Sequence, residues 1–159
     1  DANSDVIKGY EWVSTLDKNT SDTCKGLDGK VFKNADKNKR YPPAHPNCRS
    51  TTAPVLDARY SLDKSLNTRA STGAKGGQQV NADLTYYGWL KEQGAQGPKG
   101  RAFVLDTLGN ERGKLFLDGG LTADKFKQLT LDDLFQPIPL SELRGKKSLQ
   151  LAFDAIDGG

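Results

Sequence analysis

The sequence predicts an α+β protein with a small β-containing core at about residues 1–60, a linker at 61–80 and a tail of short helices at 81–159. Three observations predict this class: an alternating apolar strand near the start, a polar glycine-rich stretch in the middle, and a series of short helical segments after it. The 159 residues suit one domain, or one domain plus an extension. Only 35% of the residues are hydrophobic, so we expect much of the chain in loops or docked segments.

The first element is a strand at residues 9–16, GYEWVSTL, which we expect to be buried on one face. Tyr10, Trp12, Ser14 and Leu16 alternate with more polar positions, as in a half-buried strand. We expect a compact core in this part of the chain. Its members should be Trp12, Val13, Leu16, Val31 and Phe32.

A short helical turn should follow the strand. Asp17, Thr20 and Asp22 are side chains that can cap a helix, and the turn they predict carries Cys24. Residues 26–32, GLDGKVF, then predict a turn that enters a short strand, in which Gly29 can adopt a positive φ.

The segment 41–56, YPPAHPNCRSTTAPVL, contains the only histidine of the chain, His45, and one of its two cysteines, Cys48. Three prolines restrict the backbone here, because each limits its own φ and the conformation of the residue before it. We therefore expect an extended, stiff loop that determines where His45 and Cys48 point. The end of the segment, STTAPVL, is β-prone.

The second half of the chain changes character. Residues 63–79 are small, polar and rich in glycine, which is typical of a linker. Helices are then predicted from Asn81 or Asp83 to Gly94, at 100–110, 111–120, 122–129 and 130–135, with a last helix or strand at 141–156. Thr130 and Asp133 form a Thr-x-x-Asp capping box for the helix at 130–135. Because isolated short helices are marginal in water, we expect residues 82–145 not to fold alone, which favours a subunit of an assembly.

Positive charge is concentrated near the cysteines, although the net charge is only +3. Residues 25–50 include seven basic and only two acidic residues. This local excess of positive charge could contact nucleic acid or an acidic partner. The alternative is a solvated basic loop. The proposed patch consists of Lys30, Lys33, Lys37, Lys39 and Arg40.

Two further features bear on the class of protein. No apolar run approaches the ~18 residues that a membrane span needs, so we expect no membrane span. The chain contains no methionine, which we interpret as a sign of a fragment, a processed product or part of a longer protein.

Cys24, His45 and Cys48 admit several kinds of chemistry. Zinc accepts both residue types, and the H-x-x-C spacing can place two ligands on one ion with Cys24 as the third. The fourth ligand would then be Asp17, Asp22, Asp28 or water, and three protein ligands plus water would be the pattern of a catalytic site. A Cys24–Cys48 disulfide would close a loop of about 25 residues and stabilise the fold by roughly 3 kcal/mol. Two packed thiols are the third alternative.

Catalysis is the remaining interpretation of these residues. A Cys–His pair could form a nucleophile, but nothing in the sequence resembles an oxyanion loop. His45 could act as the general base of a nuclease, with the basic loop on phosphate. A lone histidine is more often structural, so we assign no catalytic residue.

Two segments together resemble a known family. The stretches YEWVSTLDKNTSDTCKGLDGKVF and YPPAHPNCRSTTAPVL are similar to the head-morphogenesis domain of tailed-phage minor head proteins, the Mu F-like family. The segments TYYGWLKEQ, LGNERGKLFLDGGL and LTLDDL resemble downstream parts of its members, so the likeness covers roughly residues 9–135. The motif maps onto Trp12, Asp17, Thr20, Cys24, Leu27, Asp28, Gly29, Pro42, Pro43, His45, Pro46, Cys48 and Arg49.

The chain also departs from the family pattern. The family often has Arg at the position of Asn19 and further cysteines at the positions of Ser21 and Ser50. These differences weaken the metal hypothesis, because a full set of thiolates is absent. The long helical region that normally precedes the domain is also absent, so we expect this chain to be the C-terminal portion of such a protein.

The resemblance implies a minor virion component that is made in the host cytoplasm and located in the head. Its expected partners are the portal and major capsid proteins, with DNA as a further candidate. The expected role is non-enzymatic, in head assembly or in genome packaging or delivery, with zinc as the only candidate cofactor. The alternative is a nuclease or toxin-like domain based on His45 and carried in the virion.

Overall fold

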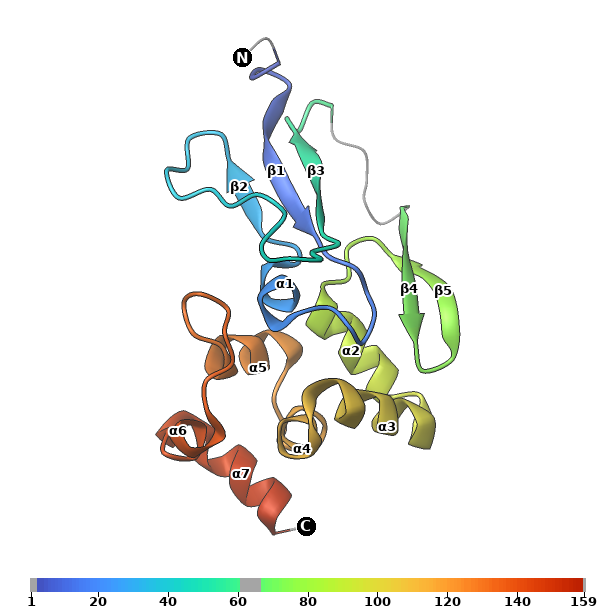
Figure 1. Ribbon diagram of the computed structural model, residues 1–159, viewed down its shortest axis with the longest axis vertical. Coiled ribbons are helices and arrows are strands. Elements are labelled where there is room, and N and C mark those ends of the chain that lie inside the picture. The colour runs from blue at the N-terminus through green and yellow to red at the C-terminus, as the bar shows by residue number, and fades with distance from the viewer. Residues whose placement is uncertain (1–2, 61–66, 159) are drawn as a thin grey trace.

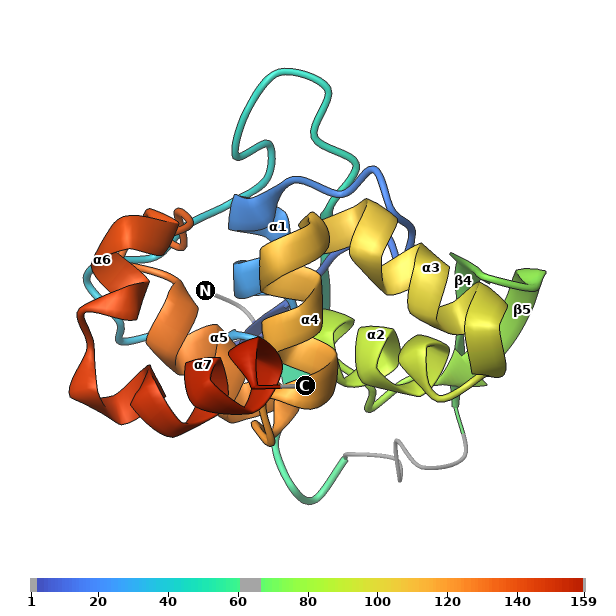
Figure 2. The same cartoon turned by 90° about the horizontal axis from the view of Figure 1, so that it is seen from below.

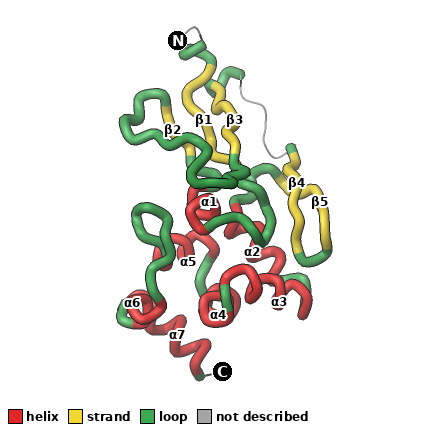
Figure 3. Tube along the Cα trace, in the orientation of Figure 1, coloured by secondary structure: helices red, strands yellow, loops and turns green. Residues whose placement is uncertain are grey.

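A computed structural model describes residues 3–60 and 67–158. Strands and helices are segregated in it: the sheet lies at one end of the molecule, and most of the helices gather at the other (Figures 1 and 3). The predicted α+β class is confirmed.

The sheet has three antiparallel strands in the order β2-β1-β3. The central strand β1 (Ile7–Val13) pairs with β2 (Val31–Lys33) on one side and with β3 (Thr51–Leu56) on the other. Tyr10 lies opposite Phe32 in one pairing. The proline-rich loop between β2 and β3 extends away from the helical layer (Figure 2).

Helix α1 (Asp22–Leu27) connects the first two strands and sits between the sheet and the other helices (Figure 1). Its cap is Ser21, not one of the predicted caps Asp17, Thr20 and Asp22, because the Ser21 hydroxyl accepts a hydrogen bond from the backbone N–H of Cys24. It is followed by a turn in which Gly29 has φ +80°, the left-handed conformation that glycine adopts without steric cost. The predicted turn and short strand are both present.

The core beneath the sheet is smaller than expected. Its buried members are Trp12, Cys24, Leu27 and Phe32. Two predicted members are wrong: Val13 is only half-buried and Val31 is 43% exposed, because both point to the face of the sheet opposite Trp12. Leu16 is buried as expected, but it packs into the helical core instead.

Residues 68–81 form a β-hairpin, which corrects the prediction of a linker over 61–80 for the residues from 68 onward. Strand β4 (Thr68–Gly73) pairs with β5 (Gly76–Asn81), and Gly76 has φ +90° in the turn. Two hydrogen bonds attach the hairpin to the rest of the fold. The Thr72 N–H donates to the Leu16 carbonyl, and the Ala74 N–H donates to the buried side chain of Gln93 in α2 (Tyr86–Gly94). Residues 61–66 lie outside the described residues.

Six α-helices follow the hairpin: α2 (Tyr86–Gly94), α3 (Gly97–Leu108), α4 (Asn110–Asp118), α5 (Ala123–Thr130), α6 (Leu140–Arg144) and α7 (Gln150–Asp157), with a 3-10 turn η2 (Lys147–Leu149) before α7. The helix predicted at 130–135 is wrong. Thr130 is the last residue of α5, and its hydroxyl donates to the Phe126 carbonyl instead of capping a new helix. Asp132 then accepts from the backbone of Leu134 and Gln136, which closes a turn.

The helices enclose the larger of the two hydrophobic cores. Tyr87, Phe116 and Phe126 pack ring to ring within it, with Phe116 and Phe126 at 4.8 Å between centroids. The premise that this region has a poor core is therefore wrong. Its other buried members are Leu16, Tyr86, Trp89, Leu90, Val104, Leu115, Leu131, Leu143, Leu149, Ala152 and Phe153.

The isolated segment 82–145 is still expected not to fold cooperatively, for a different reason. It would lack Leu16 on one side of the core and Leu149, Ala152 and Phe153 on the other, all of them buried. Circular dichroism of this segment should show little helix and a broad thermal transition, beside a sharp transition for the full chain. A sharp transition for the segment would contradict the prediction.

Candidate functional site

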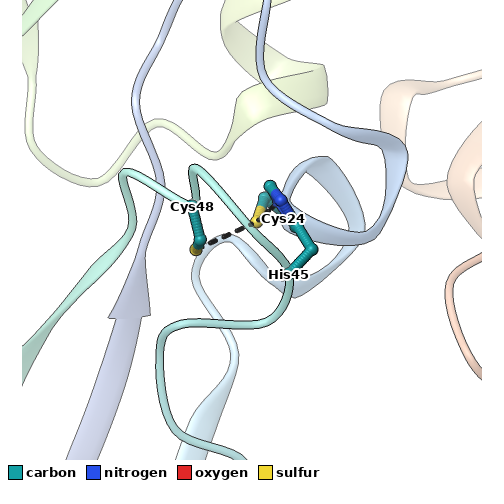
Figure 4. Close-up of side chains that lie close together, drawn as sticks. All are labelled: Cys24, His45 and Cys48. Carbon is teal, nitrogen blue, oxygen red and sulfur yellow. Dashed lines mark hydrogen bonds between the residues drawn. The ribbon is translucent and has the colours of Figure 1, made fainter.

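Cys24, His45 and Cys48 form one cluster at the junction of helix α1 and the proline-rich loop (Figure 4). The Cys24 Sγ lies 3.3 Å from His45 Nε2 and 3.7 Å from Cys48 Sγ. All three ligand atoms lie within 4.8 Å of one another. The structure thus brings together the three residues that the sequence singled out.

Local backbone structure positions each of the three side chains. Cys24 lies in the first turn of α1, one turn after the Ser21 cap. In the loop, the Cys48 N–H donates to the His45 carbonyl, and Asn47 between them has φ +63°. This tight turn directs the side chains of His45 and Cys48 to the same point, as an H-x-x-C spacing requires.

The tautomer of His45 follows from its neighbours. Its Nδ1 lies 2.7 Å from the Pro46 carbonyl oxygen, which can only accept, so Nδ1 carries the proton. In the neutral ring, Nε2 therefore presents a lone pair to the cluster. The Ser21 hydroxyl lies 2.8 Å from that lone pair and donates to it.

The two thiols differ in their surroundings. Cys24 is 2% exposed, and burial raises its pKa. Burial also acts on Cys48, but hydrogen bonds from the backbone of Ala44 and Ser50 outweigh it and lower the pKa of Cys48 to about 7. The sulfur–sulfur distance of 3.7 Å is well above the ~2.05 Å of a disulfide, and both cysteines are free.

A polar cavity of about 20 Å³ adjoins the cluster. Ser21 and Ser50 line it together with Cys24 and His45. The resemblance inferred from the sequence implies further cysteines at these two positions, and both serines lie beside Cys24 and His45 in this cavity. The volume is enough for one water molecule.

Two other motif residues hold the loop against the end of β1. Asp17 and Arg49 form a bidentate ion pair, with one N–O distance of 2.9 Å. The hydrogen bond from Arg49 holds the pKa of Asp17 below its usual value. The Thr20 hydroxyl shares its hydrogen between the Thr15 carbonyl and, at a longer 3.2 Å, the Asp17 carboxylate.

Asp28 of the Leu-Asp-Gly motif has a fully buried side chain and links three parts of the chain. It accepts from the Ser14 backbone at 2.8 Å and from Arg69 of strand β4 at 3.0 and 3.1 Å. Arg69 also donates to the carbonyls of Ser14 and Leu84. Sequence reasoning missed Arg69, because it stands in a stretch whose composition indicates a linker.

The members of the predicted basic patch differ in their surroundings. Lys30 lies over the rings of Phe32 and Phe135, at 5.4 and 5.2 Å from their centroids, while Lys33 and Lys37 are exposed on the loop. Lys39 donates to the Asn34 carbonyl. Arg40 is half-buried, and its carbonyl accepts from the Tyr10 hydroxyl. A binding role for these residues stays a prediction.

An aromatic surface next to the basic loop is visible only in the structure. Tyr41 is 59% exposed and stacks on Tyr10, with ring centroids 4.7 Å apart. Tyr10 stacks in turn on Phe32. The three rings come from different segments, so no pattern within one segment could have revealed them.

The fold and this site define the class of molecule: a small α+β protein in which a sheet, a helix and a proline-rich loop converge on a Cys–His cluster. Residues 1–53, which contain the whole cluster, match the family model described as phage Mu protein F like protein. The resemblance to this family of phage head proteins, inferred from the sequence over roughly residues 9–135, is therefore confirmed up to residue 53, where the match ends. No curated protein and no solved structure matched the chain. None of the helices in the described part of the chain is long and apolar enough to cross a membrane.

Proposed function

We propose that the protein is a minor structural component of a tailed-phage head. In this proposal it is made in the host cytoplasm, associates with the portal and the capsid interior, and acts in head assembly or in genome packaging or delivery. The observation that carries the proposal is the family match over residues 1–53, a segment that contains the complete Cys–His cluster.

Two features of the cluster support a structural role over an enzymatic one. Cys24 is almost completely buried, and the adjoining cavity of about 20 Å³ has the volume of about one water molecule. The Asp17–Arg49 pair and the Asp28 network are likewise devoted to holding segments together. In this proposal the motif residues of the Mu F-like pattern stabilise the fold, and the surface of the protein binds its partners.

DNA is the second partner in the proposal, and the proline-rich loop is the surface for it. Exposed Lys33 and Lys37 can contact phosphate, and the exposed Tyr41 ring can stack on a base. This combination of positive charge and an accessible aromatic ring supports contact with the packaged genome.

Mass spectrometry of purified virions tests the proposed location. The protein should be present in intact virions at a fixed ratio to the portal. Its loss from the particles after DNA release would assign it to genome delivery, and its retention would assign it to head assembly. Absence from intact virions would overturn the proposal.

The nuclease or toxin-like alternative rests on the Nε2 lone pair of His45, and the His45→Gln substitution tests it. We expect a small loss of stability, about 1 kcal/mol in the metal-free protein, because the glutamine oxygen can still accept from Ser21. Thermal melting and a DNA-cleavage assay should be compared with the unsubstituted protein, and neither protein should cleave. Cleavage by the unsubstituted protein alone, with equal melting temperatures, would show that the enzymatic alternative is right.

A further inference from the structure

The geometry points to a structural zinc site: we propose that Cys24, His45 and Cys48 bind one Zn²⁺ ion, with a water molecule as the fourth ligand. The ion would join helix α1 to the proline-rich loop. The inference rests on the three side chains and their surroundings, and it does not depend on where the protein resides in the virion.

The ligand distances fit a tetrahedral ion. With Zn–S bonds of about 2.3 Å, two sulfur ligands stand about 3.8 Å apart at the tetrahedral angle, and a sulfur and a nitrogen ligand stand about 3.5 Å apart. The corresponding distances here are 3.7 Å between the two Sγ atoms and 3.3 Å from Cys24 Sγ to His45 Nε2. Only small movements of the side chains are needed to complete the arrangement.

The orientation of His45 is that of a metal ligand. Histidines that bind metals usually donate their other ring N–H to a carbonyl or carboxylate, which holds the ring in place. His45 donates from Nδ1 to the Pro46 carbonyl and places its Nε2 3.3 Å from the Cys24 Sγ. The Ser21 hydroxyl, which donates to the Nε2 lone pair in this structure, can rotate towards the cavity when an ion takes its place.

Charge balance also favours a divalent ion. Binding would release the two thiol protons to solvent, and the two thiolates would neutralise the ion while His45 stays neutral. The two cations next to the ligands in sequence are both paired with a carboxylate: Lys25 with Asp22, and Arg49 with Asp17. The partly buried site would therefore carry no net charge.

The fourth ligand is a water molecule, because the neighbouring carboxylates are committed elsewhere. Asp17 pairs with Arg49, Asp22 with Lys25, and Asp28 with Arg69. The polar cavity beside the ligands has the volume of a single water, and the hydroxyls of Ser21 and Ser50 line it. Three protein ligands and one water are otherwise the pattern of a catalytic zinc site, but a cavity of only about 20 Å³ beside the ligands favours an ion that stabilises the fold.

Titration of the reduced, metal-free full chain with CoCl₂, followed by ZnCl₂, tests the proposal. We expect one Co²⁺ per chain, with the intense d–d absorption of a tetrahedral site and thiolate-to-cobalt charge transfer. One equivalent of Zn²⁺ should then abolish both signals. Cys48→Ser should weaken zinc binding at least ~100-fold, beyond what the loss of an outer-shell partner costs. Asp22→Asn, a control on α1 two residues from Cys24, should change it less than ~3-fold, since Asp22 is not a ligand.

A gain-of-ligand variant keeps the test decisive if a cysteine variant fails to fold. Ser21→Cys places a third thiolate beside His45 Nε2, so it should tighten zinc binding at least ~10-fold and strengthen the charge-transfer band. The proposal would be overturned by a folded, reduced chain that shows no charge transfer with Co²⁺. It would equally be overturned by a Cys24–Cys48 disulfide in protein grown with zinc, or by a Cys48→Ser variant that binds as tightly as the original. Virion mass spectrometry tests only the location of the protein. The zinc proposal and the proposed function can therefore fail independently of each other.

Discussion

Replacing Arg69 with methionine is expected to lower the free energy of unfolding by about 3–5 kcal/mol, because it leaves the Asp28 carboxylate buried without its cation. The Asp28 side chain is fully buried and that of Arg69 is 14% exposed. Arg69 also satisfies the carbonyls of Ser14 and Leu84, so its loss would leave several polar groups without a partner. Equilibrium denaturation with urea, monitored by circular dichroism, measures the change.

Arg59→Met is the matched control for this prediction. Arg59 also pairs with an aspartate, Asp57, but its side chain is 68% exposed. An exposed pair contributes about 0–1 kcal/mol, so the control should be nearly neutral. If Arg69→Met cost no more than Arg59→Met, the Asp28 network would not be what joins the hairpin to the sheet.

Trp12→Ala should also be strongly destabilising, by about 3–5 kcal/mol. The Trp12 ring is completely buried in the smaller core, and its Nε1 donates to the Ser14 hydroxyl at 3.0 Å. The core beneath the sheet has few members, so no neighbouring side chain can fill the space that the indole leaves. Thermal and urea-induced unfolding should both report the loss.

Val31→Ala, on the adjacent strand β2, separates the effect of burial from that of strand propensity. Val31 is 43% exposed on the opposite face of the sheet. Its truncation should cost less than about 1 kcal/mol, since little apolar area returns to water. Similar losses for the two variants would mean that the smaller core contributes little to stability.

The Trp12 and Arg69 substitutions test contacts between different parts of the chain. Trp12 stabilises the sheet and α1, which position the Cys–His cluster, whereas Arg69 joins that region to the hairpin and to the start of α2. Phe135 adds a further contact, because its ring packs against both hydrophobic cores. The Mu F-like segment and the helical region are thus joined by buried polar and aromatic contacts.

The sequence alone predicted the elements that depend on neighbouring residues. Alternation indicated the strand around Trp12, capping side chains indicated the helical turn that carries Cys24, and the positive φ available to Gly29 indicated the turn that follows. The prolines and the H-x-x-C spacing indicated that His45 and Cys48 point to one place. Periodicity, capping and restricted φ all act within a few residues, which is why the sequence reveals them.

The tertiary structure decided everything that depends on partners far apart in the chain. A polar, glycine-rich stretch became a hairpin because Thr72 pairs with Leu16 and Ala74 with Gln93. Short helices share a large core because α7 and Leu16 close it from both ends. Asp17 and Asp28 were candidate ligands until each was seen to pair with an arginine from a distant segment. The role of a side chain depends on which charged group or ring contacts it in the fold. The linear sequence does not give the distance between residues that are far apart in the chain.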